Sequence, residues 1–175
     1  SETTKPRNSY DECVKYIVDE LDLAAKDLPT VTQNVIDYGR VDKRTTLAMK
    51  ARILLYAASP MFNGNNQDYA DFKNPDGKPL VTNTYDVNKW KLAADAAKAV
   101  IDVMPNGLYK KFDATGALDP FASYRDVFID RWNADVIWSR PSTGISNWTV
   151  HAAPRQMRGW NGLGVTQQMI DAYHM

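Results

Sequence analysis

The chain has 175 residues, of which 44% are hydrophobic and 24% are charged, a composition typical of a globular domain with a buried core. Lys plus Arg number 21 and Asp plus Glu number 21, so no excess of positive charge favours a nucleic-acid partner. The single cysteine excludes an internal disulfide and a cysteine-based zinc site. The longest apolar run, 53–58, is far too short to cross a membrane as a helix.

Three segments have the apolar periodicity of helices. Ser9 and Glu12 have the S-x-x-E spacing of a capping box, which predicts a first helix over 10–28. Asp42 is expected to cap a second helix over 42–59, and a third is expected over 87–104. The residues predicted to face inward are Cys13, Val14, Ile17, Val18, Leu21, Ala24, Ala25 and Leu28 in the first helix, Leu47, Ala48, Ala51, Leu54, Leu55 and Ala58 in the second, and Trp90, Ala93, Ala94, Ala97, Ile101 and Met104 in the third. The second helix carries further apolar residues and is expected to be buried on more than one side.

The segments between and after these helices have weaker patterns. Residues 63–84, rich in Asn, Asp, Gly and Pro, are expected to form a long loop with a tight turn at 74–77. Residues 110–165 are expected to be an irregular, aromatic-rich loop region, in which 135–138 has the pattern of a short strand. Thr166 is expected to cap a final helix over 166–175, which is cut short at the end of the chain. We therefore expect a single partial domain, 1–175, that is all-α, with a helical scaffold over 9–109.

No catalytic or metal-binding motif stands out. His151 and His174 lack the spacing of a zinc hydrolase, and no phosphate-binding loop or serine-nucleophile motif occurs. The acidic residues of 68–76 do not meet the register of a calcium loop, so calcium there stays a minor alternative. We therefore expect no catalytic residue, no metal and no cofactor.

The tryptophans cluster, because four of the five lie between 132 and 160. Recognition of sugars needs flat aromatic faces against C–H groups, with polar side chains nearby to bond the hydroxyls. Asn147 adds a further polar side chain to this stretch, whereas Trp90 and Trp132 are expected to pack. The candidate ligand-binding residues are Trp148, Trp160, Asn161, Arg155 and Trp138. Packing within the region is the alternative for each tryptophan among them.

The segment from Gly39 to Pro60, GRVDKRTTLAMKARILLYAASP, resembles the SusD/RagB family of outer-membrane nutrient-binding lipoproteins of Bacteroidetes. Further segments agree in the same order, so the resemblance covers nearly the whole chain. These segments are 10–12 with the helix ending AAKDLP at Pro29, 90–101 with GLY at 107–109, 133–138, and 166–173. The least family-typical parts are 63–84 and 141–162.

The resemblance implies an all-helical scaffold of antiparallel, tetratricopeptide-like helix pairs whose loops hold a glycan or similar nutrient. It also implies a location on the cell outer membrane, a lipid anchor in a segment outside this sequence, and delivery of the nutrient to a TonB-dependent transporter. Cys13 lies within a predicted helix and does not resemble a lipidation site. Two other functions remain open: a tetratricopeptide-like protein-interaction module without a ligand site, and a glycan-cleaving enzyme.

Overall fold

The computed structural model describes residues 6–32, 34–104, 107–139 and 146–173. The chain divides into two compact units, Ser1–Ser139 and Arg140–Met175, which are described separately below as the scaffold unit and the C-terminal unit. The described residues are mostly helical, which confirms the predicted all-α fold. The long helices α1 (Tyr10–Asp27), α2 (Lys43–Ala58) and α4 (Asn88–Val103) match the three predicted helices to within a residue at each end.

Side-chain caps start the first two of these helices where the sequence predicts. The Glu12 backbone N–H donates to Ser9 Oγ at 3.3 Å, and the Ser9 backbone N–H donates to the Glu12 carboxylate at 2.7 Å. At α2 the Thr45 backbone N–H donates to Asp42 Oδ1 at 3.0 Å. Each cap satisfies an N–H group that has no partner within the first turn of a helix.

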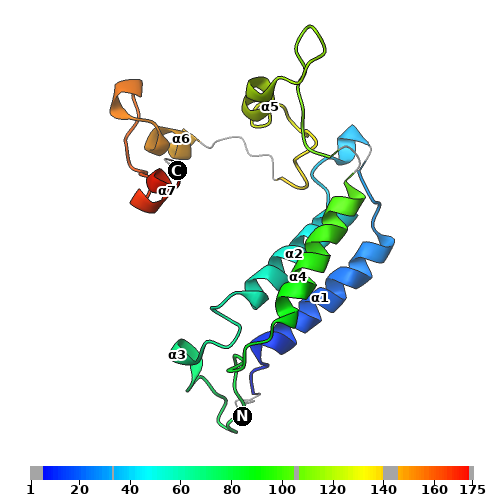
Figure 1. Cartoon of the computed structure of the whole chain (residues 1–175), viewed down its shortest axis with the longest axis vertical. Helices are drawn as coiled ribbons and strands as arrows, with labels where there is room; N and C mark the ends of the chain where they lie inside the picture. The colour runs from blue at the N-terminus through cyan, green and yellow to red at the C-terminus, as the bar shows by residue number, and fades with distance from the viewer. Residues whose placement is uncertain (1–5, 33, 105–106, 140–145, 174–175) are drawn as a thin grey trace. The chain divides into compact units, whose positions relative to one another are not determined.

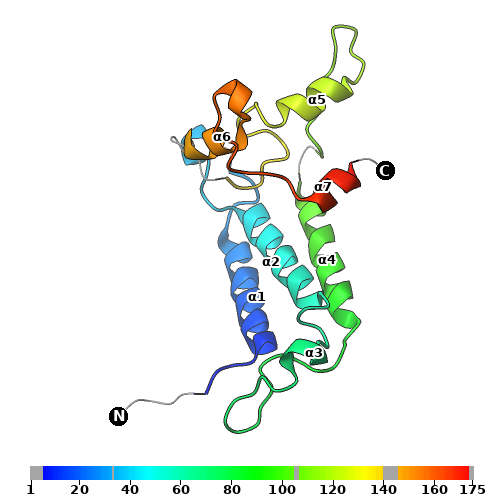
Figure 2. The ribbon, with the colours of Figure 1, turned by 90° about the vertical axis from the view of Figure 1, so that its left-hand side faces the viewer.

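In the scaffold unit, α2 packs against both α1 and α4 (Figures 1 and 2). Successive helices run in opposite directions, so the unit is an antiparallel array with α2 in the middle. The expectation that α2 is buried on more than one side is therefore confirmed. Its contacts use small residues, because Ala57 and Ala58 of α2 and Ala93 and Ala96 of α4 are all buried.

The inward faces differ in part from the prediction. Ile17 of α1 and Leu55 of α2 are 41% and 51% exposed, and α4 departs further. Ala93 is buried as expected, but Trp90 and Ile101 are 39% and 66% exposed, and Ala96 is buried instead of Ala97. α4 is apolar around much of its circumference, so periodicity alone does not select one face. α4 buries its alanine face where it packs on α2, because larger side chains at these positions would hold the two helices apart.

Ion pairs connect the helices of the scaffold unit. Lys50 of α2 binds Asp22 of α1 at 2.7 Å, and Lys89 of α4 binds Asp11 of α1 at 2.6 Å. The i, i+4 spacing of Asp22 and Lys26 predicts an ion pair between them along α1. The structure instead pairs Asp22 with Lys50, whose side chain is 23% exposed at the interface between α1 and α2. These pairs support a structural role for the cations of α2.

The predicted loop 63–84 contains the short helix α3 (Asn66–Tyr69). Asn63 joins the two ends of this loop. The buried Asn63 side chain exchanges hydrogen bonds with the backbone of Asp86 at 2.9 and 2.8 Å. The tight turn at 74–77 is confirmed, since the Gly77 N–H donates to the Asn74 carbonyl at 2.9 Å. The φ angle of 86° at Gly77 is one that glycine adopts without strain.

The region 110–165 is only partly irregular, because it contains α5 (Pro120–Asp126), α6 (Ser146–Ala152) and the 3₁₀ turn η2 (Arg155–Met157). Such short helices leave little periodicity in a sequence, which explains why they were not predicted. The predicted strand at 135–138 is wrong. Asp135 lies in a turn and the rest of the segment is irregular, and the Trp138 side chain donates a hydrogen bond to the Gly39 carbonyl.

The final helix of the C-terminal unit, α7 (Gln167–Ala172), begins after Thr166 as predicted. The Met169 backbone N–H donates to Thr166 Oγ1 at 3.3 Å. Residues 174 and 175 of the predicted helix lie outside the described residues.

Substitution of Ala93 by Leu is expected to lower the free energy of unfolding by about 1–3 kcal/mol, because the added atoms must enter a close helix contact. Ala93 is 5% exposed. The matched control is Ala97→Leu, four residues along on an exposed position of the same helix, with an expected change within about 0.5 kcal/mol. Urea unfolding followed by circular dichroism measures both. Equal effects of the two substitutions would contradict the observed face of α4.

Candidate functional site

The predicted site residues fall in both units. Trp138 lines a cavity of about 210 Å³ in the scaffold unit, here called the scaffold pocket. Trp148 lines a hollow of about 290 Å³ in the C-terminal unit, here called the Trp148 hollow. The two differ in the hydrogen-bonding groups that their side chains leave free.

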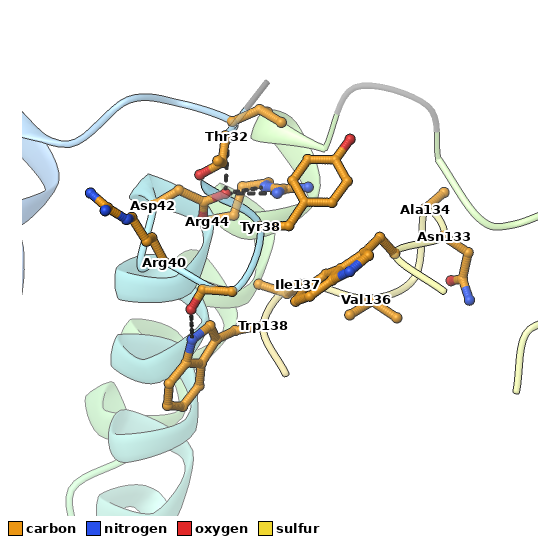
Figure 3. Close-up of a pocket in the computed structure, with 13 residues that line it drawn as sticks. Thr32, Tyr38, Arg40, Asp42, Arg44, Asn133, Ala134, Val136, Ile137 and Trp138 are labelled. Carbon is orange, nitrogen blue, oxygen red and sulfur yellow. Dashed lines mark hydrogen bonds and ion pairs between the residues drawn. The ribbon is translucent and has the colours of Figure 1, made fainter. Parts of the chain in front are cut away.

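The scaffold pocket lies where the turns around 132–138 meet the start of α2 (Figure 3). The Trp138 indole N–H donates to the Gly39 carbonyl at 3.0 Å. Tyr38 and Trp132 pack with ring centroids 5.4 Å apart. Gly39 has a φ of 93°, which favours glycine, and a Cβ there would also make a tight contact of 3.3 Å with the Trp132 ring.

Asp42 is the polar centre of the scaffold pocket and is only 1% exposed. Its carboxylate accepts hydrogen bonds from the Arg44 side chain at 2.7 Å and from the Thr32 backbone N–H at 3.4 Å, as Figure 3 shows. Burial opposes ionisation, but the hydrogen bonds from Arg44 and Thr45 outweigh it and hold the pKa of Asp42 below its ordinary value. Asp42 is therefore an ionised structural group and not an acid poised to donate a proton.

The other polar groups of the scaffold pocket are also engaged within the protein. Arg40 pairs with Asp37 at 3.2 Å. The Asn133 side chain donates to the carbonyls of Val127 and Asp130 at 2.7 and 2.8 Å. The pocket therefore offers aromatic faces but few free hydrogen-bonding groups. This chemistry suits packing of the 132–138 turns better than recognition of a polar ligand.

The Trp148 hollow differs from the scaffold pocket because polar side chains in its lining are free of hydrogen bonds to other described residues. Its lining residues are Asn147, Trp148, His151, Gly162 and Leu163. The first three lie on α6, and the backbone N–H groups of Gly162 and Leu163 donate to the His151 carbonyl at 2.9 and 3.0 Å. A Cβ at Gly162 would overlap the His151 ring, so any side chain at this position would displace that ring. The hollow is thus formed by a backbone turn that folds back over a helix.

The sequence predicted a loop around Trp148, but this residue lies on the helix α6. Its side chain is 67% exposed. In the part of the chain that the structure describes, the side chains of Asn147 and His151 form no hydrogen bonds with other residues. An open indole face beside free polar groups is the combination that sugar recognition requires.

The remaining predicted residues have different environments. Trp160 packs edge-to-face on His151, with ring centroids 4.9 Å apart, but it does not line the hollow. Asn161 and Arg155 are exposed and do not line the hollow. Of the predicted residues in this unit, Trp148 alone lines the hollow, Trp160 contacts the hollow through His151, and neither Asn161 nor Arg155 lines it.

Sequence reasoning considered His151 only as a metal ligand and missed it as a component of this site. The signal was available, because positions 147, 148 and 151 share one face once the segment is recognised as a helix. Among the described residues, no group of three His, Cys, Asp or Glu side chains is arranged to hold a metal ion. No described helix has both the length and the apolar content needed to cross a membrane.

The fold defines an all-α protein, and the chain is similar to solved structures of one bacterial protein. A structure of BT4246, a protein of Bacteroides thetaiotaomicron, is 35% identical over 69% of this chain and 20% of that chain, with a TM-score of 0.52. The selenomethionine form of BT4246 is 35% identical over 68% of this chain and 20% of that chain, with a TM-score of 0.50. The chain thus spans about a fifth of the length of these structures. No protein-family model and no curated protein matches it.

Proposed function

We propose that the chain is of the SusD/RagB type and binds an oligosaccharide or related nutrient without cleaving it. The observation that carries this proposal is the exposed Trp148 indole at the edge of a hollow of about 290 Å³. This volume is close to the lower end of the roughly 300–1,000 Å³ typical of small-ligand pockets. A sugar ring stacked on Trp148 would leave its hydroxyls within reach of Asn147 and His151.

The rest of the proposed function draws on the family resemblance. It comprises a position on the bacterial outer-membrane surface, a lipid anchor outside this sequence, and transfer of the nutrient to a TonB-dependent transporter. The likeness to a Bacteroides protein at 35% identity supports the bacterial group that the resemblance implies.

A glycan panel tests the proposal against its two alternatives. The chain is immobilised and each glycan is applied, with retention measured by surface plasmon resonance and products measured by chromatography. Retention of at least one glycan without product is the expected result. Product release would favour the glycan-cleaving enzyme, and failure to retain any glycan would favour a protein-interaction module.

Substitution of Gly162 by Ala is expected to weaken glycan binding by at least about tenfold, because the added methyl group displaces His151 from the hollow. Gly164→Ala is the matched control, since a Cβ at Gly164 meets no atom within 4 Å. Its expected effect on affinity is negligible. Isothermal titration with the retained glycan measures both variants. Equal affinities would show that the position of His151 is irrelevant to binding.

A further inference from the structure

A second cavity, of about 430 Å³, lies in the scaffold unit where the 62–81 segment folds back against the start of α1. The Tyr10 backbone N–H donates to the Leu80 carbonyl at 2.7 Å, and the Asn74 side chain donates to the Arg7 carbonyl at 2.8 Å. These two bonds join the segment to the beginning of the helix. The side chains that define this aromatic cavity are Arg7, Tyr10, Cys13, Phe62, Tyr69 and Phe72.

The walls of the aromatic cavity are flat rings held in a continuous series. Tyr10 and Phe62 are stacked with centroids 4.4 Å apart at an interplanar angle of 12°. Phe62 lies 6.3 Å from Tyr69, and Tyr69 lies 6.1 Å from Phe72. Leu80 also lines the cavity and is only 4% exposed. Phe72 is 42% exposed and Cys13 is exposed, so the cavity opens to solvent and a ligand could reach its aromatic walls.

One cation is left without a counter-charge at this cavity. The Arg7 guanidinium lies 5.1 Å from the centre of the Phe72 ring, and among the described residues no carboxylate pairs with it. The nearby carboxylates of α1 are already engaged, since Glu12 binds Lys78 and Asp11 binds Lys89, each at 2.6 Å. An anionic group on a ligand would supply the missing partner.

Besides Arg7 and Cys13, the polar residues that line the aromatic cavity are Asn8, Tyr10 and Tyr69. Within the described part of the chain, the phenol hydroxyls of Tyr10 and Tyr69 form no hydrogen bonds. Burial raises the pKa of Tyr10, and the neighbouring Asp11 and Tyr69 act in the same direction, so this hydroxyl stays protonated and able to donate. A sugar would bring many hydroxyls that such walls could not satisfy, whereas a flat apolar ring would need none.

We propose that the aromatic cavity binds a planar aromatic compound that carries a carboxylate. Its ring would lie against the aromatic walls, and its carboxylate would accept hydrogen bonds from Arg7 and a phenol hydroxyl. This site is separate from the Trp148 hollow and does not rest on the function proposed for that hollow.

Cys13 provides a direct test, because it lines the cavity, is exposed and is the only cysteine in the chain. The rate of Cys13 alkylation by iodoacetamide is measured by mass spectrometry on the full chain while 2-naphthoate is titrated. Saturating 2-naphthoate is expected to slow alkylation at least about fivefold. The neutral analogue 2-naphthamide cannot form the charged pair. It is therefore expected to need at least about tenfold higher concentration for half-maximal protection.

Two variants distinguish the aromatic cavity from other sites. Arg7→Met keeps an apolar stem but removes the charge, and it is expected to weaken protection by 2-naphthoate about tenfold while circular dichroism stays unchanged. Trp148→Ala is expected to leave protection intact. Absence of saturable protection in the unaltered chain would overturn the proposal, and so would equal protection by 2-naphthamide. Glycan retention is measured independently, so failure of either proposal is distinguishable from failure of the other.

Discussion

Replacement of Asp42 by Ala is expected to lower the free energy of unfolding by about 3–5 kcal/mol, the cost typical of breaking a buried ion pair by removing one partner. The side chains of Asp42 and Arg44 are 2% and 13% exposed, and their shortest contact is 2.7 Å. The substitution also removes the cap of α2 at Thr45 and the bond from the Thr32 backbone. It therefore leaves a buried guanidinium and two backbone N–H groups without their acceptor.

Urea unfolding at pH 7 measures this effect, with Asp37→Ala as the control. Asp37 also pairs with an arginine, Arg40, but the Arg40 side chain is 78% exposed, so the expected cost is at most about 1 kcal/mol. A loss below about 1 kcal/mol in Asp42→Ala would contradict the role of Asp42 as the centre that joins the start of α2 to the preceding turn.

The same carboxylate gives stability a defined pH dependence. The pKa of Asp42 is lower in the folded chain than its ordinary value, so the folded state favours the ionised form. Its contribution is fully present above the unfolded pKa of about 4 and is lost as the pH falls through the lower folded pKa. Glu12 acts in the same sense, because its hydrogen bond with Lys78 lowers its pKa to about 2. Unfolding measured between pH 7 and pH 2 should show a shallower loss in Asp42→Asn than in the unaltered chain.

Replacement of Trp148 by Ala is expected to weaken glycan binding by roughly thirtyfold or more, since truncation of a central aromatic contact commonly costs at least about 2 kcal/mol. The indole is 67% exposed on α6, so its removal takes away the stacking surface and leaves the helix intact. Isothermal titration measures affinity, and far-ultraviolet circular dichroism verifies the fold.

Two tryptophan variants serve as controls for that result. Trp138→Ala removes the indole bonded to Gly39 and is expected to reduce stability but not glycan affinity. Trp160→Ala removes the ring packed on His151 and is expected to give a smaller loss of affinity than Trp148→Ala. Unchanged affinity in Trp148→Ala would remove the basis for assigning the glycan site to this hollow.

The sites show where prediction from sequence reaches its limit. The tryptophans that clustering selected are all exposed, since Trp138, Trp148 and Trp160 are 51%, 67% and 60% exposed, and their part in ligand binding stays a prediction. Clustering could not separate Trp138, whose indole N–H is bonded to a backbone carbonyl 99 positions earlier in the chain. It also missed His151, which becomes part of the hollow only because residues 160–163 fold back over α6. These outcomes depend on contacts between distant residues, which residue type alone does not encode.

The sequence by itself determined the local features of this protein: the all-α class, the limits of α1, α2 and α4, and the caps at Ser9, Asp42 and Thr166. Helix periodicity, capping and turn formation act over a few residues, so they can be read directly along a chain. Only the tertiary structure decided which face of α4 is buried and that Lys50 takes Asp22 from Lys26. These outcomes depend on which neighbours are available in space. In α4 the face with the small residues Ala93 and Ala96 is buried, and the face with Trp90 and Ile101 is exposed.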